Sequence, residues 1–110
     1  MPLVTVFNLR AEDPLSAIED ALTNALASMP ELKINREDVD VVPVLKPDGF
    51  RAAVTRINVD LWERSERTKA GLQELATRVA RAFQCVVGEE RKVKVVVRPY
   101  AVEASGWVSL

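Results

Sequence analysis

A proline in the second position is the residue of this sequence best suited to proton transfer at neutral pH. If Met1 is removed, Pro2 carries a free secondary amine, and an α-amino group has a reference pKa of about 8. The sequence contains no histidine, so the usual proton-transfer side chain is missing. With Met1 attached, the Pro2 nitrogen is an amide without basicity. Alternatively, Pro2 is a rigid first residue of an edge strand, where proline is tolerated.

Three cations are candidates to support such a base. Nearby cations and an apolar wall lower the pKa of an amine, and cations also hold a carboxylate and stabilise an enolate. Arg10 and Arg64 each precede an expected helix, and Lys94 lies in an expected strand. The alternative for the two arginines is a solvated charge, although a cation is unfavourable at a helix N-terminus. The alternative for Lys94 is an exposed strand face.

Composition excludes several other kinds of site. Fifteen basic and sixteen acidic residues give a net charge of −1, which argues against a nucleic-acid partner. The single cysteine, Cys85, permits no internal disulfide, and we expect it to be a small buried hydrophobe. A zinc site is excluded in practice, and no cofactor is implied. We interpret Asp60 and Glu63 as surface charges. Apolar runs are too short to span a membrane and no secretory signal is present, so we expect a cytoplasmic protein.

The elements that would position these residues alternate between strands and helices. Asp13 is the expected N-cap of the first helix with Pro14 at its first position, and Ser65 is the expected N-cap of the second helix. Pro43 predicts an edge strand or a bulge. We predict strands over about 1–10, 39–45, 52–61 and 93–97. Apolar residues at helical spacing predict the two helices. The buried stripe of the first helix is Leu15, Ile18, Leu22, Ala25, Leu26 and Met29, and that of the second is Leu72, Leu75, Ala76, Val79 and Phe83.

The two halves of the sequence are related by a shift of 54 residues. The shift moves Arg10 onto Arg64, Ile18 onto Leu72 and the valines of 39–42 onto those of 93–96. We therefore predict one α+β domain, 1–110, that is a pseudo-repeat of 1–50 and 51–110. Each half is a βαβ unit with parallel strands, and both helices cover one face of a four-stranded sheet. The other face is partly apolar, and we expect oligomerisation to cover it, with the tail around Trp107 contributing.

The duplicated βαβ order, the proline in position two and the length resemble the tautomerase superfamily, of the 4-oxalocrotonate tautomerase, 5-carboxymethyl-2-hydroxymuconate isomerase and macrophage migration inhibitory factor type. The segment 61–69, LWERSERTK, looks like the Leu-x-Gly-Arg-Ser segment that opens a helix in short tautomerases. Segments 41–43 and 106–107 look like parts of migration inhibitory factor. The resemblance covers essentially the whole chain.

This resemblance implies a homotrimer that isomerises an unsaturated 2-oxo acid. The amino-terminal proline of the family acts as the general base or acid, and Pro2 stands in its position. The family's helix-opening arginine, which holds the substrate carboxylate, matches Arg64 and, by the repeat, Arg10. A second substrate-binding arginine falls at Lys94, and its counterpart in the first half is Asp40. Arg56 occupies the place in the second half that Pro2 has in the first. No cofactor, nucleic acid or membrane is implied.

Departures from the family leave alternatives open. Lys94 and Val96 replace a tyrosine and an asparagine of migration inhibitory factor, the glycine before the arginine is Glu63, and Cys85 lacks a redox partner. One alternative is a decarboxylase or dehalogenase that uses the same Pro2. Another is a non-catalytic binding module, trimeric or ferredoxin-like, because that fold shares the β-α-β-β-α-β order.

Overall fold

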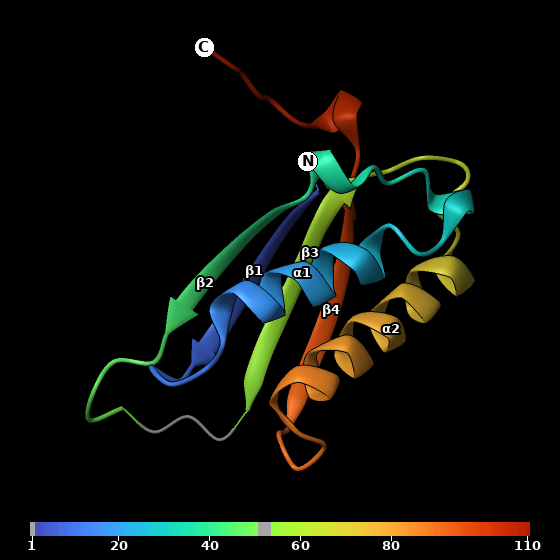
Figure 1. Ribbon diagram of the computed structural model, residues 1–110. Helices are drawn as coiled ribbons and strands as arrows, with labels where there is room; N and C mark the ends of the chain where they lie inside the picture. The colour runs from blue at the N-terminus through green and yellow to red at the C-terminus, as the bar shows by residue number, and fades with distance from the viewer. Residues whose placement is uncertain (1, 51–53) are drawn as a thin grey trace.

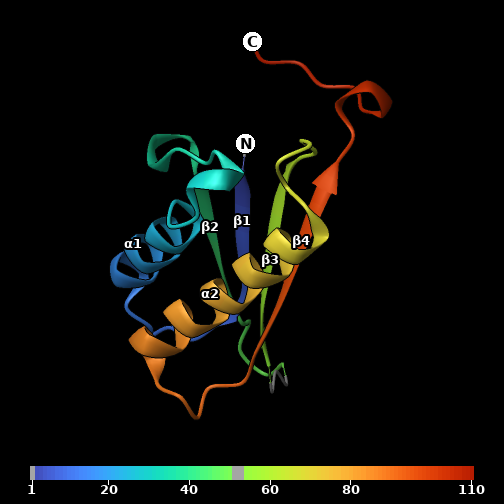
Figure 2. The same ribbon diagram turned by 90° about the vertical axis from the view of Figure 1, so that its right-hand side faces the viewer.

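Within the part of the chain that the structure describes, two helices cover one face of a four-stranded sheet, and the opposite face carries no helix (Figures 1 and 2). The structure is a computed structural model, and it describes residues 2–50 and 54–110. Met1 and the beginning of the predicted third strand, Ala52 and Ala53, lie outside the described residues. The elements are β1 (Leu3–Leu9), α1 (Leu15–Leu26), β2 (Asp40–Leu45), β3 (Thr55–Trp62), α2 (Lys69–Val87) and β4 (Val93–Tyr100), with short 3-10 turns at Pro30–Leu32, Arg36–Asp38 and Val102–Ala104.

The strand order is β2-β1-β3-β4. β1 pairs with β2 and β3 pairs with β4 in parallel, whereas the two central strands β1 and β3 run antiparallel. The sheet is therefore mixed, and the predicted α+β fold of two βαβ units is confirmed. Pro43 lies in β2, which is an edge strand as its proline predicts.

The shift of 54 residues also relates the two halves of the structure. It moves Leu15, where α1 begins, onto Lys69, where α2 begins. It moves Asp40, the first residue of β2, onto Lys94, the second residue of β4. The two units meet through the antiparallel β1–β3 pair, so the start of β1 lies at the same end of the sheet as the last residues of β3 and β4.

The core lies between the helices and the sheet, and alternation along the strands explains which side chains enter it. Val4 and Val6 of β1 and Ile57 of β3 have no exposed surface, because side chains two apart share one face of a strand. Burying an aliphatic side chain of this size contributes about 1.5–3 kcal/mol. The helices supply the opposite side of the core through the buried residues Ile18, Leu22, Ala25 and Leu26 of α1 and Leu75, Val79 and Phe83 of α2.

Both predicted helix caps were wrong. Pro14 is the N-cap of α1, without a side-chain cap, and the Asp13 carboxylate instead accepts two hydrogen bonds from Arg91, at 2.9 and 2.8 Å. Thr68 is the N-cap of α2, and its Oγ1 accepts a hydrogen bond from the Gly71 N–H at 3.1 Å. Ser65 lies three residues earlier, in the connection between β3 and α2.

Two further expectations were wrong. Cys85 is exposed, because two residues along a helix correspond to a rotation of about 200°, away from the buried Phe83. Asp60 is only 9% exposed, because Arg98 and Tyr100 from β4 cover its carboxylate. Glu63 is exposed, as predicted. Across residues 2–50 and 54–110, neither helix combines the length and the apolar character that crossing a bilayer requires.

Candidate active site

Pro2 is buried where the chain enters the central strand β1. Its carbonyl accepts a hydrogen bond from the Asp40 N–H at 3.1 Å, which ties it to the start of the edge strand β2. The next residue, Leu3, faces Asp40 on one side and Asp60 on the other. Pro2 therefore lies at the end of the sheet where β3 and β4 finish, and Figure 1 shows the N-terminus there.

Arg64 lies at this same end, in the connection from β3 to α2. It lines an open groove of about 640 Å³ between α2 and the edge strand β4, which we call the α2–β4 groove. Pro2 does not line this groove. Charged, polar and apolar residues all line the groove: Glu63, Arg64, Ser65, Arg67, Lys69, Leu72, Gln73, Ala76, Val95, Val96, Val97 and Pro99.

The Arg64 guanidinium forms an ion pair with Glu66, which is not itself a lining residue of the groove. Nε of Arg64 lies 3.1 Å from Glu66 Oε1, and about half of the Arg64 side chain is exposed (48%). The hydrogen bond from Arg64 lowers the pKa of the Glu66 carboxyl below its usual value. Exposed ion pairs of this kind contribute little to stability, so the Arg64 guanidinium can exchange Glu66 for another carboxylate.

Arg67 has a different environment from Arg64. Its guanidinium is half-buried and donates hydrogen bonds to the backbone carbonyls of Trp62 and Leu32. Burial lowers the pKa of Arg67, and the nearby charge of Arg64 lowers it further. The sequence pattern contained Arg67 and Lys69, since both belong to the segment 61–69, but nothing local to that segment distinguished their roles from that of Arg64.

The other three predicted site residues lie at the opposite end of the sheet. Arg10 is exposed just after β1, eight residues from Pro2, which corresponds to about 26 Å of strand. Lys94 pairs with Arg56, and Arg56 faces Phe7, five residues or about 17 Å along β1 from Pro2. Lys94 is exposed, and Arg56 donates a hydrogen bond to Asn58 at 3.2 Å. One chain therefore groups Arg10, Arg56 and Lys94 away from Pro2 and Arg64.

The helix-free face carries a polar and aromatic cluster at the Pro2 end that the sequence did not predict. Asp60 accepts hydrogen bonds from Arg98 Nε at 2.9 Å and from the Tyr100 hydroxyl at 3.3 Å. Beside it the Trp62 and Trp107 rings lie 6.3 Å apart, at an angle of 50°. Trp107 is nonetheless 68% exposed, and Figures 1 and 2 show the C-terminal tail extending away from the sheet and helices.

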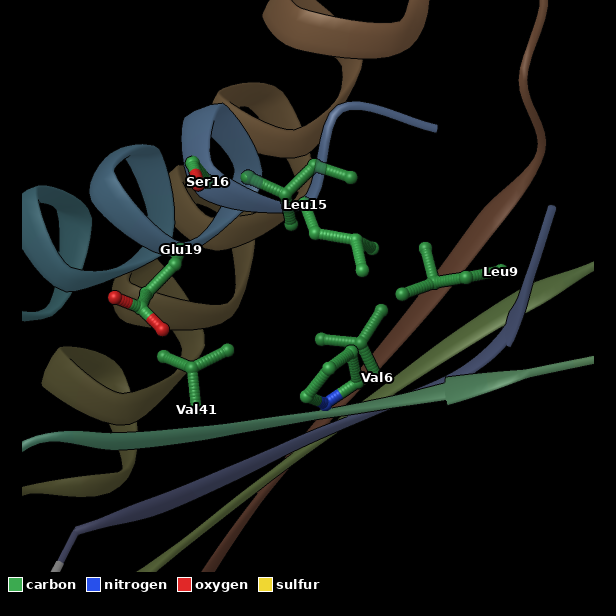
Figure 3. Close-up of a pocket in the computed structure, with 8 residues that line it drawn as sticks. Val6, Leu9, Leu15, Ser16, Glu19 and Val41 are labelled. Atoms are coloured by element: carbon green, nitrogen blue, oxygen red, sulfur yellow. The ribbon is translucent and has the colours of Figure 1, made fainter. Parts of the chain in front are cut away.

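A second, smaller cavity of about 100 Å³ lies between α1 and the β1–β2 pair (Figure 3). Its wall is mostly apolar, with Val6, Leu9 and Val41 among its lining residues, and Glu19 at its edge. None of the described residues that line this cavity is a cation, so they do not fit a carboxylate. No group of three metal-ligating side chains gathers within residues 2–50 and 54–110.

Comparison with solved structures identifies the fold. A wild-type fused 4-OT that forms an asymmetric trimer superposes with a TM-score of 0.79 at 15% identity, over 96% of this chain and 92% of the other. A fused 4-OT that forms a symmetric trimer superposes with a TM-score of 0.71 at 19% identity, over 91% of this chain and 86% of the other. FG41 malonate semialdehyde decarboxylase inhibited by 3-bromopropiolate superposes with a TM-score of 0.72 at 18% identity, over 98% of this chain and 90% of the other. No protein-family model and no curated protein matches this sequence.

This chain therefore has the same fold as the fused 4-OT structures and the decarboxylase, and at the level of the fold the predicted resemblance is confirmed. The solved structures with this fold include both a 4-OT and a decarboxylase, so the fold does not specify one reaction. Because the identities are below 20%, the roles of individual residues have to be argued from this chain's own geometry.

Proposed function

We propose that this chain is a homotrimeric tautomerase that moves a proton on an unsaturated 2-oxo acid, with Pro2 as the general base and acid. The observation that carries the proposal is the position of Pro2, buried at the start of the central strand at the same end of the sheet as Arg64. A secondary amine in an apolar environment near cations has a lowered pKa, which makes it an effective base near neutrality.

The proposed reaction needs only proton transfer. The Pro2 amine, freed by removal of Met1, takes a proton from the enol hydroxyl or from the carbon beside the carbonyl. Arg64 holds the carboxylate and, with Lys94, stabilises the negative charge of the dienolate that forms. Protonated Pro2 then gives the proton to a different carbon, so that a double bond moves and no atom is gained or lost.

Lys94 is proposed to reach this site from a neighbouring subunit, since in its own chain it lies too far from Pro2. Pro2 adjoins the edge strand β2, whereas Arg64 lies in the groove beside the opposite edge strand β4. The groove beside β2 is lined by the acids Glu19, Asp20, Glu37 and Asp40 along with Arg36, whereas the α2–β4 groove has Arg64, Arg67 and Lys69 along with Glu63. Edges of opposite charge favour a head-to-tail ring, which would bring the β2 edge beside Pro2 of one copy to the β4 edge of the next, and β4 carries Lys94.

The test is the intact mass of the protein together with phenylpyruvate ketonisation by wild type and by Pro2→Ala. We expect the mass to lack methionine and the variant to lose activity by orders of magnitude. The activity of wild type should rise with pH as the Pro2 amine deprotonates, with an apparent pKa below about 8. A native protein that keeps Met1, or a Pro2→Ala variant as active as wild type, would contradict the proposal.

Decarboxylation is the second candidate, and the similarity to malonate semialdehyde decarboxylase favours it specifically. Here Pro2 would act in its protonated form. CO₂ leaves the carboxylate bound by Arg64, the electron pair stays on the adjacent carbon, and that carbon takes the proton from Pro2. Release of CO₂ from malonate semialdehyde, without ketonisation of phenylpyruvate, would select this reaction. Neither activity, in a protein that still binds carboxylates, would indicate a binding module.

A further inference from the structure

The connection from β3 to α2, which carries Arg64, is bound to a distant part of the chain by one side chain. Arg67 Nη1 donates a hydrogen bond to the Trp62 carbonyl at 2.6 Å, at the end of β3. Its Nε donates to the Leu32 carbonyl at 2.9 Å, and its Nη2 makes a longer contact of 3.5 Å with the Lys33 carbonyl. The guanidinium thus joins the connection to the turn that follows α1.

The Leu32 carbonyl depends on this guanidinium for a hydrogen bond. Leu32 is fully buried, and a buried carbonyl without a partner is costly. Lys33 ends its 3-10 turn in the left-handed conformation, with φ of 55°. The first turn of α2 packs closely on Leu32, since a Cβ added at Gly71 would lie 3.3 Å from a Leu32 methyl carbon. The turn at Leu32 is therefore a fixed support for the connection.

Arg64 stands within the loop that Arg67 closes. The Arg67 N–H donates to the Arg64 carbonyl at 3.0 Å, while the Arg67 side chain returns to the Trp62 carbonyl two residues before Arg64. The backbone of Arg64 is therefore fixed from both sides. Its own side chain stays half exposed in the groove and pairs only with the exposed Glu66 among the described ion pairs.

We propose that Arg67 is a positioning residue, which holds the Arg64 guanidinium in the α2–β4 groove where it binds the substrate carboxylate. This inference rests on the proposed function, because it assigns the carboxylate to Arg64. Lysine cannot replace Arg67 fully, since a single ammonium does not have the planar fork that spans the carbonyls of Trp62 and Leu32. Arg67 needs no contact with the substrate in this role.

The test is a double-mutant cycle between Arg64→Ala and Arg67→Met, with binding of phenylpyruvate and of its methyl ester measured by calorimetry. We expect Arg67→Met to weaken phenylpyruvate binding about tenfold, and Arg67→Lys by less, because small displacements of a binding group are costly. In the Arg64→Ala background, Arg67→Met should weaken phenylpyruvate binding by less than about twofold. Binding of the ester should change little. The KM for phenylpyruvate should rise more than kcat falls.

Arg78→Met is the matched control. Arg78 lies on α2, and like Arg67 it binds a backbone carbonyl near the end of α1: its Nη1 donates to the carbonyl and the hydroxyl of Ser28, at 3.3 and 3.0 Å. It does not line the groove. We expect this variant to bind phenylpyruvate as wild type does. A direct readout is the NMR order parameter of the Arg64 Nε–H, which should fall in Arg67→Lys and stay unchanged in Arg78→Met.

The outcomes separate this inference from the proposed function. Arg67 does not position Arg64 if Arg64→Ala weakens phenylpyruvate binding but the Arg67 variants do not. The same conclusion follows if Arg67→Met weakens binding as much in the Arg64→Ala background as in wild type. An equal loss in Arg78→Met would show a general structural effect and overturn the inference. If Arg64→Ala leaves phenylpyruvate binding unchanged, the carboxylate assignment and the inference both fail. Should Arg67→Met not fold, the cycle is closed with Arg67→Lys.

Discussion

Arg64 and Glu66 form a contact in which a substrate carboxylate would have to replace a protein carboxylate. The two side chains are 3.1 Å apart and are 48% and 35% exposed. Arg64 keeps the pKa of Glu66 below its usual value, so Glu66 remains charged throughout the neutral range. We predict that Glu66→Gln raises the affinity for phenylpyruvate a few-fold, because the competing charge is lost. Isothermal titration calorimetry measures this change.

Glu63→Gln provides the control for that prediction. Glu63 is next to Arg64 in the chain and lines the groove, so the substitution makes the same change in net charge near Arg64 without removing the Glu66 ion pair. Equal gains in phenylpyruvate affinity in the two variants would mean that only the overall electrostatic potential of the groove matters. Salt should reduce the gain in Glu66→Gln, since added ions screen exposed charges.

Asp13 and Arg91 form a buried ion pair that fixes the turn before α1. Their side chains are only 6% and 8% exposed, and Arg91 also lies over the Phe83 ring at 5.6 Å. The hydrogen bonds from Arg91 hold the pKa of Asp13 below its usual value. Since the folded-state pKa is below the unfolded value of about 3.9, the stabilisation is present above that pH and is lost as pH falls through the folded-state pKa.

We predict that Asp13→Asn lowers the free energy of unfolding by about 3 kcal/mol at pH 7, because it leaves a buried guanidinium without its counter-charge. Urea denaturation at pH 7 and at pH 3 measures the effect. The difference between wild type and variant should shrink at the lower pH. Replacing both residues, as Asp13→Leu with Arg91→Met, should cost less than Asp13→Asn alone. A constant difference at the two pH values would disprove the electrostatic role.

At the scale of the elements, the start of α2 offers two candidate caps three residues apart. Thr68 accepts a hydrogen bond from the Gly71 N–H, whereas Ser65 lies before the helix. We predict that Thr68→Ala lowers the free energy of unfolding by about 1 kcal/mol, as expected for the loss of an N-cap. Ser65→Ala should change it by less than about 0.5 kcal/mol, as for an ordinary surface position. Urea denaturation of both variants decides which residue caps the helix.

Periodicity predicted the elements well because it reports a property of each segment alone. The buried stripe of α2 at Leu75, Val79 and Phe83 and the alternation of β3 follow directly from burial of one face. The role of Asp13 could not be found in this way, because its partner Arg91 is 78 residues away. Cys85 is a different case, since the helical period itself places it opposite Phe83.

The candidate site was predictable only in part, for a reason of topology. Pro2 and Arg64 are brought to one end because β1 and β3 are antiparallel, which the strand pattern alone does not specify. The pseudo-repeat made Arg10 and Arg64 equivalent, but the same symmetry puts them at opposite ends of the sheet. The cluster of Asp60, Arg98 and Tyr100 depends on the pairing of β3 with β4, which no local pattern revealed.

For the whole molecule, the surface left uncovered indicates how copies would assemble. The helix-free face presents Thr5, Phe7, Val42 and Val96 between charged residues, and both β2 and β4 have a free edge within the described sheet. Unpaired edges and apolar strand faces are liabilities unless they are covered. Solved fused 4-OT structures with this fold include an asymmetric and a symmetric trimer. A closed ring would cover these surfaces and bring the β2 edge of one copy to the β4 edge of the next.

A shared site in such a ring makes a prediction that a site within one subunit does not. Pro2→Ala and Lys94→Ala homotrimers should each be nearly inactive in phenylpyruvate ketonisation. If they are unfolded together and refolded as a mixture, an intact site needs Pro2 from a Lys94→Ala subunit and Lys94 from a Pro2→Ala neighbour. Each condition holds for half of the subunits in a random equal mixture, so about one quarter of the wild-type activity should return.

The mixed trimers need two controls. Light scattering has to show the mass of a trimer for each variant and for the mixture, and refolded wild type has to recover its activity. A mixture of Pro2→Ala with Pro2→Ser gives no intact site by either arrangement and should stay inactive. If the Pro2 and Lys94 mixture also stays inactive while wild type refolds, Lys94 does not complete the site of a neighbouring Pro2, and the head-to-tail ring would have to be abandoned as the source of the catalytic cation.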